Sequence, residues 1–286
     1  AGQSGGGAGY QIERSLRFDS DSSGHLSRTP SSAGDLRKWT WAGWVKRSAT
    51  AGQQLFSAGT GQQNRAFIRF LGGSDTLCFE QKQNSSWNTS LRSSAVFRDL
   101  SAWYHIVVAY DSAQSTAANR VKMYVNGAEI TEFSSTTYPP QNQDGQVNTA
   151  TTHAIGTTSY STSTTPFSGY MADVHFIDGQ ALGPTSFGGF NADTGAWDPK
   201  EFTDGSYGTN GFHLDFSDPS SSASLGYDAA GSNNWTVNNI VGGSPNNTHN
   251  IDNLTNVTQI QISGTNQTVN LTKLRELFNK SSFQDG

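Results

Sequence analysis

Hydrolysis of a glycosidic bond needs two carboxylates that face each other across about 5–9.5 Å, so neighbouring acidic residues are the first candidates for chemistry. Asp173 and Asp178 lie five residues apart in the stretch ADVHFID. In a regular strand an odd offset places two side chains on opposite faces. Asp215 and Asp218 form a second pair, but Asp218 precedes Pro219 and is typical of a turn. Neither pair predicts a catalytic site, and we expect the protein not to be an enzyme.

Metal-ligating side chains are present but dispersed. The histidines are His25, His105, His153, His175, His213 and His249. Their spacing fits no zinc motif, so a zinc site would have to be assembled by the fold alone, and we predict none. We expect no cofactor, although Ca²⁺ remains an alternative because four oxygen-bearing side chains stand near predicted strand ends. These are Asp111, Asn119, Asp144 and Asp173.

The single cysteine offers little chemistry. Cys78 alternates with strand residues in TLCFE and has no second cysteine with which to form an internal disulfide. Free cysteines are among the most buried residue types. We therefore expect a buried, unreactive thiol.

Aromatic rings in polar segments favour sugar binding, because a ring stacks on the apolar face of a sugar while nearby amides and hydroxyls bond its hydroxyl groups. Four rings lie in such segments: Trp87, Tyr138, Tyr160 and Tyr207. The alternative is that they cap the ends of a sandwich. Three other aromatics fall in predicted strands, and we expect them in the core: Trp41, Trp44 and Trp103.

The elements that must position these residues are short strands rich in aromatic and β-branched residues. They are predicted at 15–18, 39–45, 54–58, 66–71, 76–79, 104–110, 121–125, 153–155, 170–177 and 212–216. Asn126 and Gly127 predict a type I′ hairpin turn, which needs positive φ at both central positions. Helical periodicity is nearly absent before the C-terminus. The pattern predicts an all-β fold, a two-sheet antiparallel jelly-roll sandwich.

Three segments follow from this pattern: a flexible Gly-rich arm at 1–13, a jelly-roll domain at 14–240, and a linker with a docking or assembly segment at 241–286. Within the domain, the strand in 211–217 is predicted to pair with the strand at 15–18 and so close a sheet edge. Residues 178–211 are predicted to run over the sheet as an ordered excursion. We expect three aromatics to hold it there: Phe187, Phe190 and Trp197.

The last segment predicts a short β-hairpin at 259–271 followed by a helix. Four apolar residues fall on one face of that helix and are the predicted assembly contact: Leu271, Leu274, Leu277 and Phe278. A helix this short is marginal in water without a partner.

Composition excludes several classes of protein. The net charge is −5 and the basic residues are scattered, so no patch suited to nucleic acid is expected. Charged residues make up 14% of the chain against about 25% in an average soluble protein. No apolar stretch approaches about 18 residues, so no membrane insertion is expected, and the sequence begins without the pattern of a signal peptide.

Several longer strings resemble one known group of domains. SAWYHIVVAYD, NRVKMYVNGAEI and PFSGYMADVHFIDGQAL are similar to the laminin-G/pentraxin type of concanavalin A-like jelly roll, over about residues 15–217. SLRFDSDSSGHLSRTPSSAG, WTWAGWVKRS, FIDGQALGPTSFG and YGTNGFHLDFSD resemble laminin-G-like domains of marine tailed-bacteriophage structural proteins. Glucanases of the same superfold carry an E-x-D-x-E strand that this chain lacks. The calcium ligands of pentraxins have no residue-by-residue counterpart here.

This resemblance implies a virion structural protein displayed on the outside of the particle, as a capsid decoration or as a tail fibre or spike component. Its implied partners are other virion proteins, further copies of the chain in a homo-oligomer, and glycans on the host surface. The alternative is a carbohydrate-binding module or adhesin that is not part of a virion. Fold by itself does not choose between them.

Overall fold

The computed structural model describes residues 10–162 and 164–240, together with the strands β18 (Gln259–Ile262) and β19 (Thr265–Thr268). The chain divides into two compact units, Ala1–Gly242 and Gly243–Gly286. β18 and β19 pair antiparallel, as the predicted C-terminal hairpin requires. The predicted helix, with Leu271, Leu274, Leu277 and Phe278, lies outside the described residues, and the three-segment division stays a prediction.

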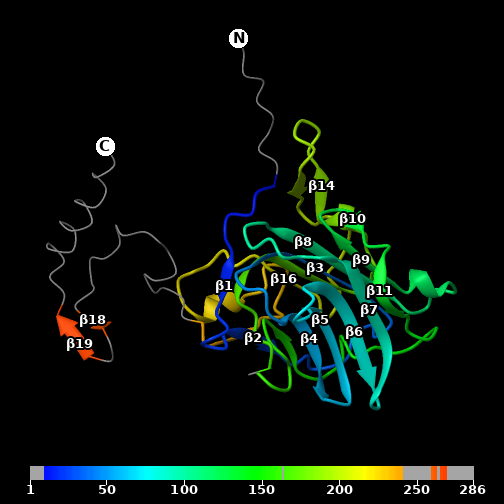
Figure 1. Ribbon diagram of the computed structural model, residues 1–286, viewed down its shortest axis with the longest axis horizontal. Coiled ribbons are helices and arrows are strands. Elements are labelled where there is room, and N and C mark those ends of the chain that lie inside the picture. Colours follow the sequence, from blue (N-terminus) through cyan, green and yellow to red (C-terminus); the bar gives the residue numbers. More distant parts are fainter. Residues whose placement is uncertain (1–9, 163, 241–258, 263–264, 269–286) are drawn as a thin grey trace, which may run out of the picture. The chain divides into compact units, whose positions relative to one another are not determined.

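The first unit is the predicted two-sheet antiparallel sandwich (Figure 1). The seven-stranded sheet has the order β1 (Leu16–Phe18), β13 (Gly169–Asp178), β3 (Lys38–Arg47), β8 (Tyr104–Asp111), β9 (Val121–Val125), β10 (Ala128–Glu129), with β16 (Phe212–Leu214) also paired to β13. The eight-stranded sheet has the order β11 (Phe133–Thr137), β7 (Ser86–Val96), β6 (Thr76–Gln83), β5 (Asn64–Phe70), β4 (Gln53–Gly61), β12 (His153–Ile155), β2 (His25–Arg28), β17 (Thr236–Asn238).

Shorter elements complete this unit. The strands β14 (Gly188–Phe190) and β15 (Trp197–Pro199) form a separate hairpin. Three short 3₁₀ helices lie in connections: η1 (Ala117–Asn119), η2 (Pro184–Ser186) and η3 (Ala223–Gly226). Within the described residues, no helix has the length and apolar character needed to span a membrane.

Aromatic side chains from the two sheets meet in one core, which holds the layers together. Trp39 of β3 packs edge-on against Phe79 of β6, with ring centroids 5.6 Å apart. Trp41 of β3 stacks on Phe56 of β4 at 6.3 Å. Because buried aromatics contribute the largest apolar areas, such cross-sheet pairs dominate the packing energy. The core position predicted for Trp41 is therefore confirmed.

The predicted hairpin at Asn126 and Gly127 is also confirmed, with φ of 48° and 80°. A second turn of the same kind was missed: Asn84 and Ser85, with φ of 49° and 70°, join β6 to β7. No strand was predicted over β7, because its outward residues are polar or small and give weak hydrophobic alternation.

Two tryptophans predicted for the core lie elsewhere. Trp44 and Trp103 are half-buried and line a pocket of about 280 Å³ with Ile12 and Pro199. Trp44 lies on the central strand β3 and faces outward. Side chains alternate along the strand, and Trp41 and Val45 fill its inner face. The strand is buried on both faces, so aromatic character alone does not tell the inner face from the outer one.

One extra residue in β13 fixes which side chains face the core. The pairing with β3 shifts between Ala172 and His175, and Asp173 at this β-bulge has a φ of 50°. Met171 before the bulge and Val174 after it both reach the core. Because side chains alternate along a regular strand, Met171 and His175 would otherwise share a face. The bulge instead leaves His175 on the outer face.

The edges of β13 correct a second prediction. The strand in 211–217 does not pair with the strand at 15–18. β1 pairs with the beginning of β13, where Leu16 lies opposite Met171, and β16 pairs with its later part, where His213 lies opposite His175. The two short strands therefore occupy successive parts of one edge, on either side of the bulge.

The excursion over the outer face of this sheet is held by two of the three predicted aromatics. Phe187 is fully buried, and the indole Nε1 of Trp197 donates to Nδ1 of His105 at 3.0 Å. Phe190 is 66% exposed and contacts Trp197 edge-on.

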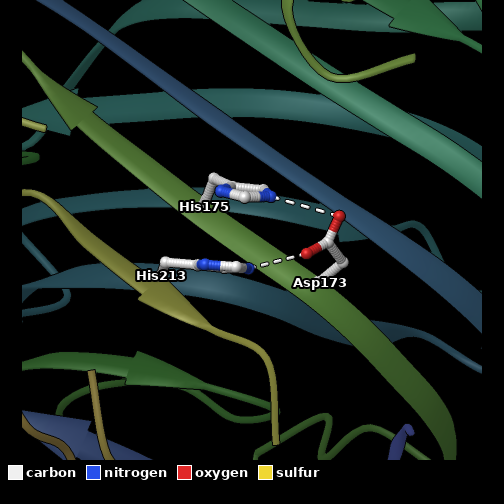
Figure 2. A group of neighbouring side chains, drawn as sticks. All are labelled: Asp173, His175 and His213. Atoms are coloured by element: carbon white, nitrogen blue, oxygen red, sulfur yellow. Dashed lines mark hydrogen bonds and ion pairs between the residues drawn. The ribbon is translucent and has the colours of Figure 1, made fainter. Parts of the chain in front are cut away.

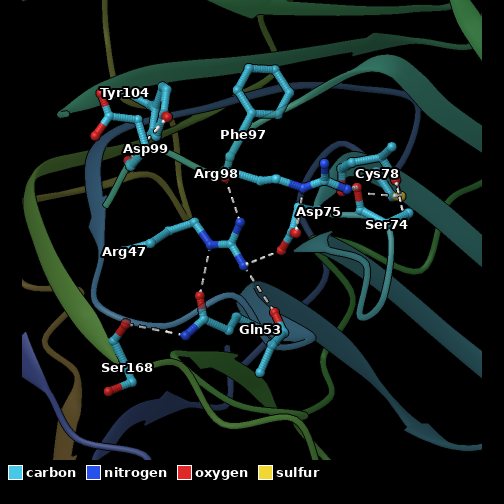
Figure 3. A network of polar contacts seen from close by, with 12 residues as sticks. Arg47, Gln53, Ser74, Asp75, Cys78, Phe97, Arg98, Asp99, Tyr104 and Ser168 are labelled. Atoms are coloured by element: carbon cyan, nitrogen blue, oxygen red, sulfur yellow. Dashed lines mark hydrogen bonds and ion pairs between the residues drawn. The ribbon is translucent and has the colours of Figure 1, made fainter. Parts of the chain in front are cut away.

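A buried guanidinium joins the strands at one end of the sandwich (Figure 3). Arg47 is 1% exposed, and its Nη2 donates to Oδ1 of Asp75 at 2.9 Å while its Nε donates to Oε1 of Gln53 at 3.0 Å. Arg98 donates from Nε to the other oxygen of Asp75 at 3.0 Å. Burial alone raises the pKa of Asp75, but hydrogen bonds from Arg47 and Arg98 and their charges hold it below its usual value.

We predict that D75N lowers the free energy of unfolding by about 3–5 kcal/mol at neutral pH, because it leaves the Arg47 charge buried without a counter-ion. A carboxylate whose folded pKa is depressed stabilises fully above its unfolded pKa of about 3.9, and that contribution is lost as pH falls through the folded pKa. Urea unfolding of wild type and D75N should therefore give a difference that shrinks below about pH 4.

The matched control is D144N, which removes an exposed carboxylate that pairs with Arg37. Exposed ion pairs contribute about 0–1 kcal/mol, so this variant should stay close to wild type. Equal stability of D75N and wild type at neutral pH would contradict the role given to Arg47 and Asp75.

Candidate functional site

The four aromatics predicted to bind sugar lie in three places. Trp87 and Tyr160 share one cluster on the outer side of the eight-stranded sheet. Tyr138 is half-buried against the core, as the capping alternative expects. Tyr207 is half-buried on the outer face of the other sheet, where its hydroxyl contacts Nδ1 of His175 at 2.8 Å.

Arg65 of β5 brings Trp87 and Tyr160 together. Its guanidinium carbon lies 5.1 Å from the ring centroid of Trp87 and 5.2 Å from that of Phe67. Its Nη1 donates to the hydroxyl of Tyr160 at 2.7 Å. Cations over aromatic faces are held by the ring quadrupole, and arginine is the usual partner. The sequence shows no sign of this cluster, because its members come from β5, from β7 on the far side of β6, and from a distant loop.

Local structure positions each ring. Trp87 lies opposite Lys82 across the Asn84–Ser85 turn, and the residue is 41% exposed. Tyr160 lies in the loop after β12. Ser57 of β4 holds that loop, because its Oγ donates to the carbonyl of Thr157 at 2.8 Å and accepts from the amide of Ser159 at 2.8 Å.

A hollow of about 480 Å³ opens beside Tyr160. Its volume falls in the range typical of small-molecule sites, about 300–1,000 Å³. Hydroxyl and backbone groups dominate its lining. The lining residues are Thr29, Gly59, Thr60, Ala150, Thr151, Thr152, Ser159 and Tyr160. Hydroxyl groups act as donor and acceptor at once, which suits the hydroxyls of a sugar.

The positive charges of this cluster have no acidic partner. Arg65 and Lys82 form no ion pair within residues 10–162 and 164–240. Lys82 lies 5.5 Å from the ring centroid of Trp87. The nearby carboxylate of Glu80 is fully buried and is taken by Arg69 and Arg92. Burial raises the pKa of Glu80, but the two arginines hold it below its usual value, so Glu80 stays ionised and is a poor proton donor.

A second group of polar side chains lies on the outer face of the seven-stranded sheet (Figure 2). Asp173 directs its two oxygens at two histidines: Oδ1 lies 2.6 Å from Nε2 of His213, and Oδ2 lies 3.2 Å from Nε2 of His175. Tyr10 donates its hydroxyl to Oδ1 at 2.8 Å. These histidines are dispersed in the sequence, and only the pairing of β16 with β13 brings them together.

Burial sets the titration of this group. Burial raises the pKa of Asp173, but its close contacts with His175 and His213 and their charges bring it well below its usual range. Burial lowers the pKa of His175, against the attraction of Asp173. Burial raises the pKa of Tyr10 and of Tyr207, and the charge of Asp173 adds to both.

The residues considered for Ca²⁺ do not fit a shared site. Asp144 is paired with Arg37, and Asp111 with Lys38. In the described part of the chain, three potential metal ligands lie close together, and neither Asp111 nor Asp144 is among them. Asp173 belongs to that group, but its neighbours are imidazoles, whereas Ca²⁺ takes oxygen ligands.

Comparison with known proteins identifies the fold family. The Laminin_G_3 model, described as the concanavalin A-like lectin/glucanases superfamily, matches residues 20–185. No curated protein matches the sequence significantly.

Solved structures with similar folds come from several sources. A heptameric SAP-like pentraxin from Limulus polyphemus is 19% identical with a TM-score of 0.41, and the match covers 61% of this chain and 74% of that one. A putative carbohydrate-binding protein from Bacteroides ovatus is 15% identical with a TM-score of 0.43, covering 78% and 57%. A tailspike protein of the Escherichia coli O157:H7 bacteriophage CAB120 is 11% identical with a TM-score of 0.39, covering 61% and 25%. The chain therefore spans less than two thirds of the last two proteins.

Cys78 is buried, as predicted, and burial with the charge of Glu80 raises the pKa of its thiol to about 11. Because the thiolate is the reactive form, we predict that a disulfide reagent at pH 8 labels the native chain far more slowly than the chain in denaturant, where one thiol per chain reacts. The absorbance of the thiolate released from the reagent measures the rate and extent of labelling. Rapid stoichiometric labelling of the native protein would contradict the assignment.

Proposed function

Because this chain belongs to the concanavalin A-like lectin/glucanases superfamily, whose model matches more than half of it, we propose that it is a non-catalytic carbohydrate-binding domain. The proposed site is the Arg65 cluster, made of Arg65, Trp87 and Tyr160, together with the adjoining hydroxyl-lined hollow. The observation that carries the proposal is the position of Tyr160, which belongs to both. An aromatic side chain then lies beside a lining rich in hydroxyl groups, the two features that sugars require.

The charges of the site favour a particular class of sugar. Arg65 and Lys82 place two cations beside the exposed ring of Trp87 without a paired carboxylate in the described part of the chain. An arginine fork matches carboxylate and sulfate-like groups in two-pronged geometry. We therefore expect glycans that carry acidic groups to bind more tightly than neutral ones.

Two features of the site support binding without hydrolysis. The residues that line the hollow include no Asp or Glu, whereas glycoside hydrolysis uses a pair of carboxylates. Glu80, the buried carboxylate on the same sheet, is held ionised between two arginines. An oligosaccharide incubated with the protein should accordingly be recovered intact.

We predict that W87A and Y160A each weaken glycan binding about thirtyfold or more, because truncating an interface aromatic at the centre of a site costs about 2 kcal/mol. A glycan array identifies the ligand, and calorimetry on the best binder gives the affinities. R65Q should weaken the binding of acidic glycans more than the binding of neutral ones. The affinity of the wild type for acidic glycans should fall as the salt concentration rises.

The control is F190A, which removes an exposed ring on the β14–β15 hairpin, well away from β4 to β7 (Figure 1). It should bind as wild type does. An array with no bound glycan, or affinities unchanged in both W87A and Y160A, would refute the site.

We also propose a setting for this domain: display on the outside of a tailed bacteriophage particle, as a capsid decoration or as a tail fibre or spike component. The support is the resemblance of four long strings to laminin-G-like domains of phage structural proteins. Contacts with other virion proteins, assembly of several copies and attachment to host glycans belong to the same proposal. A carbohydrate-binding module outside any virion is the alternative, and the family match supports it better than the virion setting.

Mass spectrometry of gradient-purified particles tests this setting. We expect the chain in the particle band in a fixed ratio to the major capsid protein, and accessible to added protease. A chain found only in the soluble fraction of the lysate would exclude the virion setting and leave the free binding module.

A further inference from the structure

The Asp173 group, made of Asp173, His175 and His213, has the ligand types and arrangement of a metal centre. His175 and His213 are directly opposite each other on β13 and β16, and their rings stack with centroids 4.2 Å apart. The bulge adds Asp173 to the same face, two residues before His175. Two strands thus deliver three side chains to one point (Figure 2).

The spacing of the ligand atoms suits a small ion. All three atoms lie within 4.8 Å of one another. Ligand atoms at about 2.0–2.1 Å from a tetrahedral zinc ion lie about 3.3 Å apart. Two of the separations are close to that value: 3.2 Å from Oδ2 of Asp173 to Nε2 of His175, and 2.6 Å from Oδ1 to Nε2 of His213.

The hydrogen bonding of the group is incomplete as it stands. Nε2 of His175 is buried and has no hydrogen-bond partner among the described residues, despite its 3.2 Å approach to Asp173. Its other ring nitrogen contacts the hydroxyl of Tyr207. If Nδ1 donates to Tyr207, the lone pair of Nε2 faces a carboxylate oxygen, which is repulsive. A cation between them removes that repulsion, and metal-bound histidines regularly donate their second nitrogen to an oxygen in this way.

Charge balance points the same way. Asp173 is 2% exposed, and no Arg or Lys pairs with it within residues 10–162 and 164–240. A buried carboxylate needs a compensating positive charge. A divalent ion supplies that charge without requiring either imidazole to be protonated.

We propose that Asp173, His175 and His213 bind one divalent transition-metal ion, of which Zn²⁺ fits the ligand set best. Two imidazoles and one carboxylate suit zinc and its first-row neighbours, whereas Ca²⁺ and Mg²⁺ select all-oxygen sites. Tyr10, in the segment before β1, donates a hydrogen bond to Asp173 behind these ligands. The ion joins β13, β16 and the segment before β1, so its role is structural and independent of the glycan site.

The test uses the full chain, freed of metal with a chelator and then titrated with Zn²⁺ in a calorimeter. We expect one ion per chain and a melting temperature raised by about 5–10 °C at a hundredfold excess of free ion over its dissociation constant. Ca²⁺ at the same concentration should leave the melting temperature unchanged. Co²⁺ as a probe should give the intense visible absorption bands of a low-symmetry, four-coordinate site.

Variants decide which residues hold the ion. D173N and H213N should each weaken Zn²⁺ binding by more than about a hundredfold, and Y207F by about ten- to a hundredfold, the usual range for a residue behind a ligand. H25N is the matched control, because His25 is buried on β2 of the other sheet and contacts the carbonyl of Ser23. It should bind Zn²⁺ as wild type does.

Circular dichroism of each metal-free variant separates loss of the site from loss of the fold. If a variant does not fold, the wild-type calorimetry and cobalt spectrum still decide the question. A folded wild-type chain that shows no saturable Zn²⁺ binding would overturn the proposal. So would a folded D173N or H213N chain that binds as tightly as wild type.

Discussion

The bulge at Asp173 is the constraint on which both faces of the seven-stranded sheet depend. Without the extra residue, the alternation of β13 would place Met171 and His175 on the same side, and the core would have to accept an imidazole or lose an apolar side chain. With it, Met171 and Val174 both fill the core while Asp173 and His175 face outward. The same residue marks the place where β1 ends as the neighbour of β13 and β16 begins. A bulge of this kind is a functional feature rather than a defect, because it redirects side chains at a chosen point of a sheet.

The two outer faces of the sandwich carry different chemistry. On the seven-stranded sheet, the excursion after β13 covers the polar residues, and buried aromatics such as Phe187 exclude water from them. On the eight-stranded sheet, Arg65 and Trp87 remain partly open to solvent beside a hydroxyl-lined hollow. Covered ionisable groups suit a structural ion, and open aromatic and cationic groups suit a soluble ligand. The low content of charged residues fits the hollow on the second face, whose lining carries hydroxyl groups and no charged side chain.

The fold class and the Asn126 turn could be predicted from the sequence, because alternation and turn chemistry are local properties. The core position of Trp41 followed from the same pattern. The core position predicted for Trp44 was wrong, since β3 is buried on both faces and the pattern does not tell them apart. The sites depend on pairing between distant strands, which no spacing in the sequence reveals. Trp87 and Tyr160 were found as separate aromatics, while Arg65, which joins them, carries no local signal. His175 and His213 fit no zinc motif in the sequence, and only the pairing of β16 with β13 brings them together.

The central claim is that this lectin-like sandwich binds glycan at the Arg65 cluster. The most direct measurement is a two-dimensional amide and indole NMR titration of the labelled protein with the glycan that binds it best. We expect the shifts to concentrate at Gly59, Thr60, Ser159, Tyr160 and the indole of Trp87, with the resonances of His175 and His213 unchanged. Shifts that concentrate on the opposite sheet, or that spread without saturation, would contradict it.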